Sequence, residues 1–259
     1  MQLPVLPPGT ILQHLYLKER LRRIKPGYFL EVGCGRGYVS KVLLDLGWYG
    51  IGYDLNPKSL DYALSLNHTA VSTGRFRVKN ENFFNIEVSS SPKFDLIISC
   101  MVLEHFNDDE ELAYFEQVKN LLTFNGRTIL LVPSCPNYWG WEDEIAGHYR
   151  RYTRGYLKAI LESSGYKIDE LVGLTYPLSN WLYPISELLV KQSEGHMKYK
   201  SMQERTRLSG SRDVHFKTTF PSVMKFFLNE VTMYPFHILQ KMNKHNPNCL
   251  VLYAEATKS

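Results

Sequence analysis

The sequence predicts an α/β protein built on a doubly wound, mostly parallel sheet. Five short apolar runs alternate with helix-like stretches in roughly the first half of the chain. The first run (28–32) breaks into a loop with glycine at alternate positions, and the second (49–53) ends at the acidic residue Asp54. Alternating strands and helices build parallel sheets, which bind ligands at the carboxyl ends of their strands. The glycine loop and Asp54 therefore indicate a ligand site at one edge of the sheet.

The individual elements follow from local signals. Thr10 caps a predicted helix that runs to about Ile24, and Pro26 and Gly27 end it before the first strand. Asn56 and Pro57 start a helix after the second strand. Further helices are predicted over residues 38–46, 108–122 and 156–163, and further strands over 76–78, 94–99, 128–132, 167–172 and 248–256.

The composition is that of an ordinary globular protein. The 259 residues are 44% hydrophobic, and their net charge of +4 is too small to indicate nucleic acid by itself. Four scattered cysteines favour a reducing compartment, and the eight histidines show no ligand spacing, so no metal site is expected. The first residues do not resemble a signal peptide, and no apolar run approaches the ~20 residues that span a bilayer. We expect a cytoplasmic protein without a membrane span.

The glycine loop discriminates between classes of nucleotide site. A dinucleotide fingerprint requires its third glycine three residues after the second, and Tyr38 occupies that position here. The Gly-Lys-Ser/Thr of a triphosphate loop is also missing from the sequence. The pattern Glu31-x-Gly33-x-Gly35-x-Gly37 instead resembles motif I of the class I methyltransferases that use S-adenosylmethionine. In that family the loop holds the methionine end of the cofactor.

The resemblance implies a cofactor site assembled from successive strand ends. Asp54 lies one strand–helix unit after the loop, where its carboxylate accepts both ribose hydroxyls. Asn82 occupies the position of the family's adenine-binding acid, with Glu81 before it, which leaves open which of the two side chains accepts from the adenine amino group. Tyr16 and Arg20 of the leading helix are further contacts that the resemblance implies. The expected cofactor-binding residues are Glu31, Gly33, Cys34, Gly35, Gly37, Tyr38, Asp54, Leu55, Asn82, Phe83, Cys100, Met101 and His105.

The sequence after the fourth predicted strand indicates which class of acceptor the protein would methylate. Leu103-Glu104-His105 resembles the Leu-Glu-His of ubiquinone-biosynthesis O-methyltransferases. It lacks the Asn/Asp-Pro-Pro-Tyr with which amino-methylating nucleic-acid enzymes hold a flipped base. The resemblance therefore implies a small-molecule acceptor and no nucleic-acid substrate.

A segment dense in aromatic and ionisable residues follows the fifth strand. We expect Tyr138, Trp139 and Trp141 to enclose the reacting methyl group, and Arg150 and Arg151 to bind an anionic group of the acceptor. His148 and His105 are both candidates for the general base, and the sequence does not rank them. The alternative is structural: the two arginines pair with nearby acids to hold a loop, and Thr153 caps the next helix.

The resemblance also implies that the last strand lies antiparallel beside the sixth, which completes a seven-stranded sheet. Residues 1–173 and 247–259 then form the cofactor-binding domain, and residues 174–246 form an insertion. Helix-like runs occur over 181–190 and 223–242, and residues 191–217 carry an excess of Lys and Arg. The insertion is interpreted as a solvated face, or as a contact for an anionic substrate, a membrane surface or a second copy in a homodimer.

Three other functions remain open from the sequence. A lipid or membrane-borne acceptor would place the basic insertion against a bilayer. A non-catalytic protein of the same fold would bind S-adenosylmethionine without turnover. An NAD(P)-dependent oxidoreductase is disfavoured by the glycine spacing.

Overall fold

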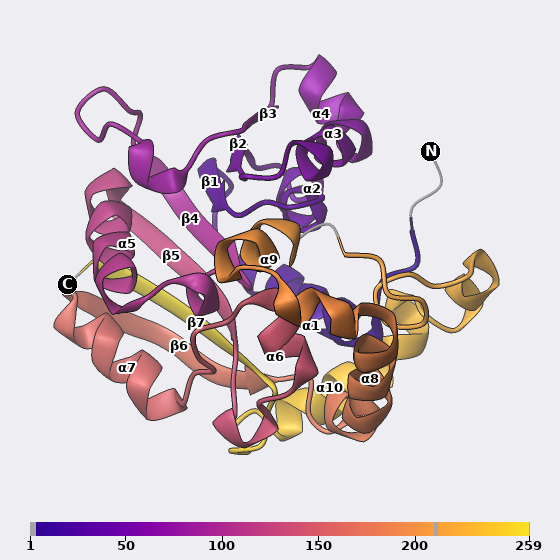
Figure 1. Ribbon diagram of the computed structural model, residues 1–259. Helices are drawn as coiled ribbons and strands as arrows, with labels where there is room; N and C mark the ends of the chain where they lie inside the picture. The colour runs from indigo at the N-terminus through magenta and orange to yellow at the C-terminus, as the bar shows by residue number, and fades with distance from the viewer. Residues whose placement is uncertain (1–3, 210–211, 259) are drawn as a thin grey trace.

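A seven-stranded sheet with helices on both sides forms the molecule (Figure 1). The computed structural model describes residues 4–209 and 212–258. The strands are β1 (Tyr28–Val32), β2 (Tyr49–Tyr53), β3 (Phe76–Lys79), β4 (Phe94–Cys100), β5 (Leu122–Pro133), β6 (Tyr166–Leu174) and β7 (Val251–Lys258). They lie in the order β3-β2-β1-β4-β5-β7-β6. β7 is antiparallel to both β5 and β6, and the pairs from β3 to β5 are parallel, so the predicted topology is confirmed.

Ten α-helices and five short 3-10 helices connect the strands in the described residues. The α-helices are α1 (Pro8–Leu21), α2 (Tyr38–Asp45), α3 (Pro57–Leu66), α4 (His68–Ser72), α5 (Asp108–Leu121), α6 (Trp141–Ala146), α7 (Arg154–Ser163), α8 (Leu178–Glu194), α9 (Met202–Ser209) and α10 (Glu230–Met242). The 3-10 helices are η1 (Phe83–Asn85), η2 (Leu103–His105), η3 (Pro136–Tyr138), η4 (Gly195–Tyr199) and η5 (Ser222–Phe226).

Both faces of the sheet are buried. Successive residues of a strand point to opposite faces, and accordingly Leu30 and Phe29 of β1 belong to different hydrophobic clusters. One cluster includes Phe115 of α5, and the other includes Leu17 of α1 and Leu43 of α2. Burial on both faces explains why the strands read as continuous apolar runs rather than as alternating ones.

Several element boundaries differ from the predicted ones. α1 begins at Pro8, so Thr10 lies in its first turn and does not cap it; proline suits this position because it lacks the N–H that would be unpaired there. β7 begins at Val251, the first residue that pairs with β5, and not at residue 248. The helix expected over 223–242 is divided into η5 and α10. The Asn229 side chain causes this division because it accepts hydrogen bonds from the N–H groups of Val231 and Thr232 and starts a new helix.

The helices between β6 and β7 pack against the N-terminal helix. Gln240 of α10 donates from Nε2 to the Leu12 carbonyl at 2.9 Å and accepts from the Thr175 N–H at 2.9 Å. Figure 1 shows α8 and α10 beside α1, at the end of the sheet where β1 and β4 terminate. Among the described residues, every helix is too short or too polar to cross a membrane.

Candidate active site

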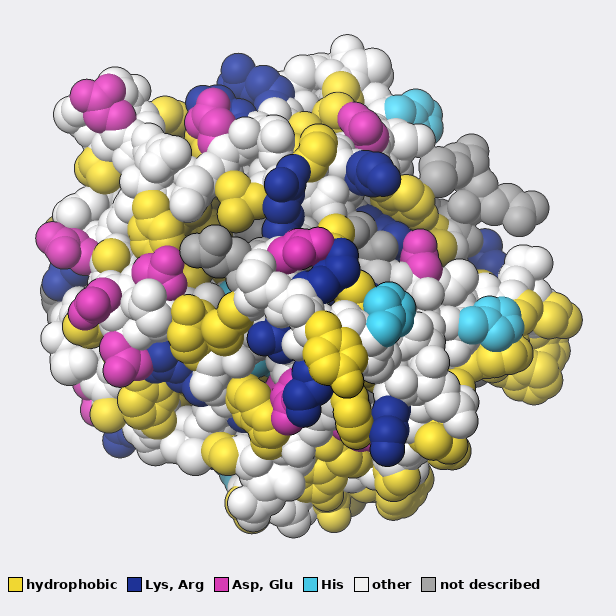
Figure 2. Space-filling model, viewed as in Figure 1, with side chains coloured by type: hydrophobic (Ala, Val, Ile, Leu, Met, Phe, Trp, Pro, Cys, Tyr) yellow, Lys and Arg dark blue, Asp and Glu magenta, His cyan; other side chains and the backbone are white. Residues whose placement is uncertain are grey.

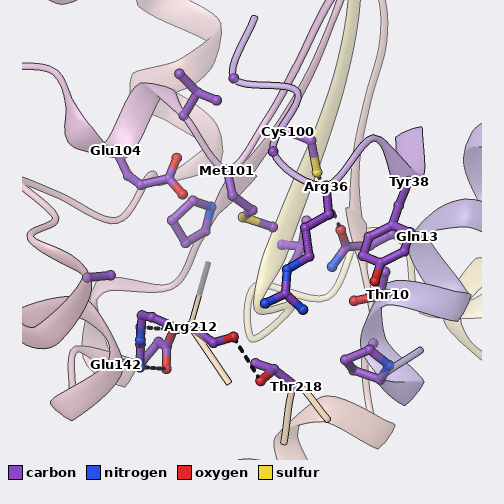
Figure 3. Close-up of a pocket in the computed structure, with 18 of the residues that line it drawn as sticks. Thr10, Gln13, Arg36, Tyr38, Cys100, Met101, Glu104, Glu142, Arg212 and Thr218 are labelled. Carbon is purple, nitrogen blue, oxygen red and sulfur yellow. Dashed lines mark hydrogen bonds and ion pairs between the residues drawn. The ribbon is translucent and has the colours of Figure 1, made fainter. Parts of the chain in front are cut away.

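A cavity of about 910 Å³ lies at the carboxyl ends of β1, β2 and β4. Residues of α1 and α8 and of the segments around α9 and η5 also line it. Figure 3 shows Glu104 on one side of the cavity, and Arg36, Tyr38 and Gln13 on the other. The cavity thus collects side chains from segments that are far apart in the sequence.

The glycine loop forms the wall between β1 and α2. Gly33 and Gly37 have φ values of +68° and +75°, a left-handed conformation that favours glycine. A Cβ at Gly33 would lie 2.5 Å from Val102 Cγ2, and one at Gly37 would lie 2.8 Å from the Ala63 Cβ of α3. Gly33 thus lets the loop pass close beneath Val102, and Gly37, which starts α2, allows that helix to approach α3.

Asp54 holds the loop against the end of β2. Its Oδ2 accepts from the Gly35 N–H at 2.8 Å, and its Oδ1 accepts from the Asn56 N–H at 2.8 Å. Burial raises the pKa of Asp54, and the hydrogen bonds from Asn56 and Gly35 partly offset this rise. Because an ionised carboxylate oxygen can accept more than one hydrogen bond, both oxygens can still accept from a pair of hydroxyl groups in the cavity.

Glu31 is a buried carboxyl group in the same wall. It accepts a hydrogen bond from the Ser40 hydroxyl. Burial raises its pKa to about 8, while Ser40 lowers it. A ligand that brings an ammonium group to this part of the cavity would therefore find a carboxyl group ready to ionise.

The loop after β3 supplies Asn82 and Phe83. The Asn82 side-chain oxygen accepts from the Phe84 N–H at 3.0 Å and so begins η1. Phe83 is buried, with its ring centroid 5.4 Å from that of Tyr114, and it lines the cavity with Asn82 and Glu81. The amide group of Asn82 thus has a structural role in addition to any contact with a ligand.

The opposite wall contains three ionisable side chains, Glu104, His105 and His148, which we call the Glu-His-His cluster. Nε2 of His148 lies 3.9 Å from Oε1 of Glu104, and the two imidazole centroids are 4.8 Å apart. Burial raises the pKa of Glu104 to about 7 and, together with the neighbouring His148, lowers the pKa of His105 to about 3.

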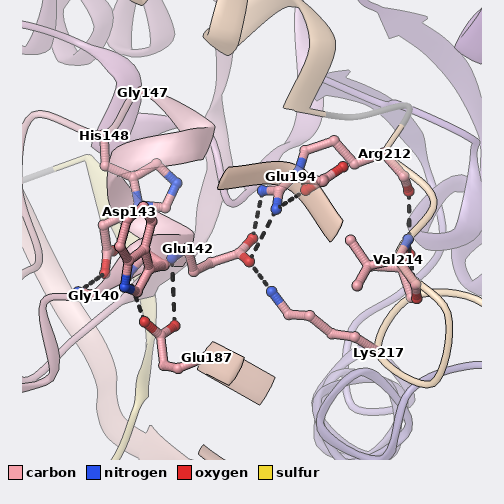
Figure 4. A network of polar contacts seen from close by, with 12 residues as sticks. Gly140, Glu142, Asp143, Gly147, His148, Glu187, Glu194, Arg212, Val214 and Lys217 are labelled. Carbon is pink, nitrogen blue, oxygen red and sulfur yellow. Dashed lines mark hydrogen bonds and ion pairs between the residues drawn. The ribbon is translucent and has the colours of Figure 1, made fainter. Parts of the chain in front are cut away.

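Asp143 orients the imidazole of His148. Nδ1 of His148 lies 2.8 Å from Oδ1 of Asp143, a buried residue of α6 (Figure 4). Nε of Arg151 donates to the same carboxylate at 2.8 and 2.9 Å. Burial alone would raise the pKa of Asp143, but the hydrogen bonds from His148 and Arg151 hold it below its usual value. An ionised Asp143 accepts the Nδ1–H of His148, and Nε2 is the ring nitrogen on the side of Glu104.

The comparisons with known proteins identify the family. A family model described as "Methyltransferase domain" matches residues 10–171. The chain belongs to the Methyltransferase domain family. This membership confirms the family predicted from the glycine loop, and with it the prediction of an enzyme that uses S-adenosylmethionine as the methyl donor. It also excludes the alternative of an NAD(P)-dependent oxidoreductase. No match was found among curated proteins.

Solved methyltransferase structures share the fold at low sequence identity. Magnesium protoporphyrin IX methyltransferase (ChlM) from Synechocystis PCC 6803 with bound SAH is 19% identical; the match covers 64% of this chain and 77% of that chain, with a TM-score of 0.54. The small RNA methyltransferase HEN1 is 19% identical over 68% of this chain and 24% of that chain, with a TM-score of 0.52. The mitomycin 7-O-methyltransferase MmcR is 16% identical over 63% and 49%, with a TM-score of 0.50. At these identities the likeness shows the fold alone.

The cavity of this methyltransferase contains nearly all of the residues predicted to bind the cofactor. These are Glu31, Gly33, Cys34, Gly35, Tyr38, Asp54, Leu55, Asn82, Phe83, Cys100, Met101 and His105. Gly37 is not among the lining residues because it faces α3. The residues present fit S-adenosylmethionine: Asp54 would offer acceptors to a ribose, and the buried Glu31 carboxyl group would face the cofactor's ammonium group.

The three aromatic residues expected to enclose the methyl group, Tyr138, Trp139 and Trp141, do not line the cavity of this methyltransferase. The Tyr138 ring packs edge-on against Tyr183, with centroids 4.9 Å apart. Trp139 is 40% exposed. The Trp141 ring lies beneath the ammonium groups of Lys191 and Lys198, at 5.2 and 5.3 Å, and so supports the insertion.

Arg150 pairs with nearby acidic residues, as the structural alternative predicted, and does not reach the cavity. Its guanidinium donates to Glu111 at 2.9 Å and to Asp108 at 2.6 Å, outside the cavity. Arg151 does line the cavity, but its guanidinium binds Asp143 and the Ser134 carbonyl. Thr153 caps α7, as predicted.

Two predicted contacts on α1 are wrong. Tyr16 is buried with its ring 5.1 Å from that of Tyr253, and Arg20 binds Glu255 at 2.9 Å and Glu170 at 3.3 Å, so both face the sheet. The cavity is lined instead by Thr10, Gln13 and His14 of the same helix. These three residues have the i, i+3, i+4 spacing of one helix face, a signal that could have identified them in the sequence.

The excess of Lys and Arg at residues 191–217 is partly neutralised by acidic residues of α6. Glu142 of α6 pairs with Arg212 and with Lys217, as Figure 4 shows. Lys198 pairs with Glu144. These contacts hold the insertion against α6, so the sequence excess does not correspond to an equally basic surface.

Proposed function

We propose that this methyltransferase acts on an oxygen or nitrogen atom of a small-molecule acceptor, such as a sugar, a phenol or quinone, or a natural-product intermediate. One observation carries the proposal: a single cavity brings the glycine loop and Asp54 together with His148 and Glu104. Its volume of about 910 Å³ is near the upper end of the ~300–1,000 Å³ that small-molecule sites occupy. It therefore has room for an acceptor beside the cofactor.

The residues of the chain would position both reactants and remove a proton. S-adenosylmethionine supplies a methyl group on a positively charged sulfur. Holding an acceptor in line with that group can contribute on the order of 7–11 kcal/mol. We assign the base role to His148 rather than to His105, because Asp143 accepts the Nδ1–H of His148 and leaves Nε2 free to take the acceptor's proton.

Calorimetric titration tests the proposed cofactor site. S-adenosylhomocysteine is expected to bind at micromolar concentration, and NADH, as the control, is expected not to bind. Replacing Asp54 with alanine should weaken S-adenosylhomocysteine binding by ~1.5–3 kcal/mol, because the lost carboxylate makes charged hydrogen bonds. Asp54→Asn removes the negative charge but keeps the shape of the side chain and one acceptor oxygen for the Gly35 or Asn56 N–H. It therefore shows how much of the lost affinity comes from the charge. Unchanged affinity in Asp54→Ala would disprove the ribose assignment.

A screen of phenols and of hydroxylated and amino sugars then tests turnover. Methyl transfer to one of these acceptors would support the proposed reaction. Binding of S-adenosylhomocysteine without turnover of any acceptor would favour a non-catalytic protein that retained the cofactor site.

A lipid-borne acceptor is a second candidate, favoured by an apolar projection of the insertion. Val223, Phe226 and Phe227, in or next to η5, are 75%, 76% and 65% exposed. Figure 2 shows hydrophobic side chains gathered on this projection, which stands out from the molecule at the right of Figure 1. Met224 and Leu228 from the same segment line the cavity. An apolar surface that continues into the cavity would let an acceptor enter from a bilayer.

Vesicle co-sedimentation tests the second candidate. Binding to vesicles that contain anionic lipid should fall when Phe226 and Phe227 are both changed to serine, and should weaken at high salt because Lys225 lies in the same helix. Equal sedimentation of the double variant would exclude this surface as the membrane contact. A dimer that the double variant loses, with no vesicle binding, would assign the surface to a homodimer instead.

A further inference from the structure

The Glu-His-His cluster has the composition of a metal site. Each of its three residues offers one ligand atom, and these atoms all lie within 4.8 Å of one another. Glu104 and His105 are neighbours in η2, directly after β4, and His148 follows α6. The hydrogen bond from the Tyr149 N–H to the Glu104 carbonyl, at 2.7 Å, joins the two segments. Because these segments are distant in the sequence, spacing alone could not reveal the cluster.

Glu104 is the strongest indication that the cluster binds a cation. Its side chain is fully buried, and neither carboxylate oxygen has a hydrogen-bond partner in the described residues. A buried carboxyl group without partners is costly, so native proteins normally provide hydrogen bonds or a cation for it. Nε2 of His148 lies 3.9 Å from Oε1 of Glu104, which is beyond hydrogen-bond distance.

The two imidazoles are oriented as metal ligands usually are. Ligand histidines typically use one ring nitrogen for the metal while the other donates to a carboxylate or a backbone carbonyl. Nδ1 of His148 lies 2.8 Å from Asp143 Oδ1, and Nδ1 of His105 lies 3.4 Å from the Gly147 carbonyl oxygen. In both residues these contacts engage Nδ1, so Nε2 is the ring nitrogen available to a metal.

We propose that Glu104, His105 and His148 bind a divalent transition-metal cation at the wall of the cavity. Two imidazoles and one carboxylate suit Zn²⁺, Mn²⁺, Fe²⁺ or Co²⁺ better than Mg²⁺ or Ca²⁺, which prefer all-oxygen sites. Ligand atoms at ~2.1 Å from such a cation are about 3–3.5 Å apart. The three side chains therefore close by about an ångström on binding. Because all three residues line the cavity, the remaining coordination positions face it.

The cation would act on an acceptor hydroxyl, an inference that rests on the proposed methyl transfer. An oxygen bound to a divalent cation loses its proton more readily, as metal-bound water does. The proton leaves to water, the resulting oxyanion takes the methyl group, and the sulfonium becomes a neutral thioether. Under this inference the acceptor atom is oxygen, and His148 is a ligand in the metal-bound enzyme rather than the base.

Metal titration of the 259-residue chain tests the site independently of activity. After treatment with a chelator and its removal, Zn²⁺ is added in a calorimeter, and Co²⁺ is added while the visible absorption spectrum is recorded. One equivalent is expected to bind. Glu104→Gln, which keeps the buried shape, and His105→Ala should each weaken binding by more than about 100-fold, beyond the ~10–100-fold typical of outer-shell changes. His68→Ala changes an exposed histidine of α4 and should bind as the wild type does.

The possible outcomes separate this proposal from the proposed function. Stoichiometric binding that Glu104→Gln abolishes supports the site. The absence of stoichiometric binding, or equal affinity in Glu104→Gln and the wild type, would overturn it. S-adenosylhomocysteine is titrated into the same samples. If it binds while the metal does not, only the metal site fails; if the metal binds while S-adenosylhomocysteine does not, the proposed methyl transfer fails instead.

Discussion

Replacing His148 with alanine is expected to lower kcat by ~10²–10⁴-fold, the range that a positioned base contributes. S-adenosylhomocysteine affinity should stay close to that of the wild type, because His148 lies on the wall opposite Asp54 and the glycine loop. The measurement is steady-state turnover with any acceptor that the wild-type enzyme methylates. A loss below about tenfold in a variant that folds normally would remove the base role.

Asp143→Asn provides the matched test of how His148 is oriented. An amide of the same shape cannot stabilise an imidazolium as a carboxylate does, so kcat should fall although His148 is present. Measuring kcat with and without the metal distinguishes the two proposed roles of His148, general base and metal ligand. If His148 is a base, its loss lowers kcat equally in chelated and metal-loaded enzyme. If it is a ligand, chelation alone reproduces most of the loss in the wild type.

The wall of the cavity that contains the glycine loop and Asp54 could be predicted because its structure is encoded locally. The loop conformation is encoded by glycines at alternate positions, and Asp54 follows its strand directly, so both are placed as soon as the strands are recognised. The carboxyl ends of parallel neighbours must then meet at one edge of the sheet. Only Gly37 departs from this pattern, since its small size serves the approach of α2 to α3.

The opposite wall of the cavity could not be predicted, because it depends on contacts between distant segments. The residue type of Trp141 suits the enclosure of a substrate, but its contacts point it elsewhere. Its backbone N–H donates to Glu187 of α8, and its ring faces Lys191 of the insertion. Glu104 and His148 meet only because the segment after α6 packs against η2, where the Tyr149 N–H donates to the Glu104 carbonyl. The direction of a side chain after a strand is set by such tertiary contacts, which residue type and spacing do not specify.

The second large effect is expected from Arg150, as a loss of stability. Glu111 of α5 is 1% exposed and accepts hydrogen bonds from Arg150, Tyr152 and Tyr156. Replacing Arg150 with alanine removes the cation and leaves a buried carboxylate, so the free energy of unfolding should fall by ~3–5 kcal/mol. Urea unfolding measures this change. S-adenosylhomocysteine affinity should be unaffected, because Arg150 lies outside the cavity.

Asp108→Ala is the control that separates the two ion pairs of Arg150. The Asp108 side chain is 87% exposed, so its pair with Arg150 is screened by water and should contribute ~0–1 kcal/mol. The double variant Arg150→Met, Glu111→Gln should lose less stability than the two single changes added together, because each single change leaves the other partner buried. If Arg150→Ala left the free energy of unfolding unchanged and raised KM for the acceptor, the prediction that Arg150 binds the substrate would be supported instead. We expect the loss of stability instead, because without Arg150 the buried Glu111 carboxylate would keep, among the described residues, only its hydrogen bonds from the Tyr152 and Tyr156 hydroxyls.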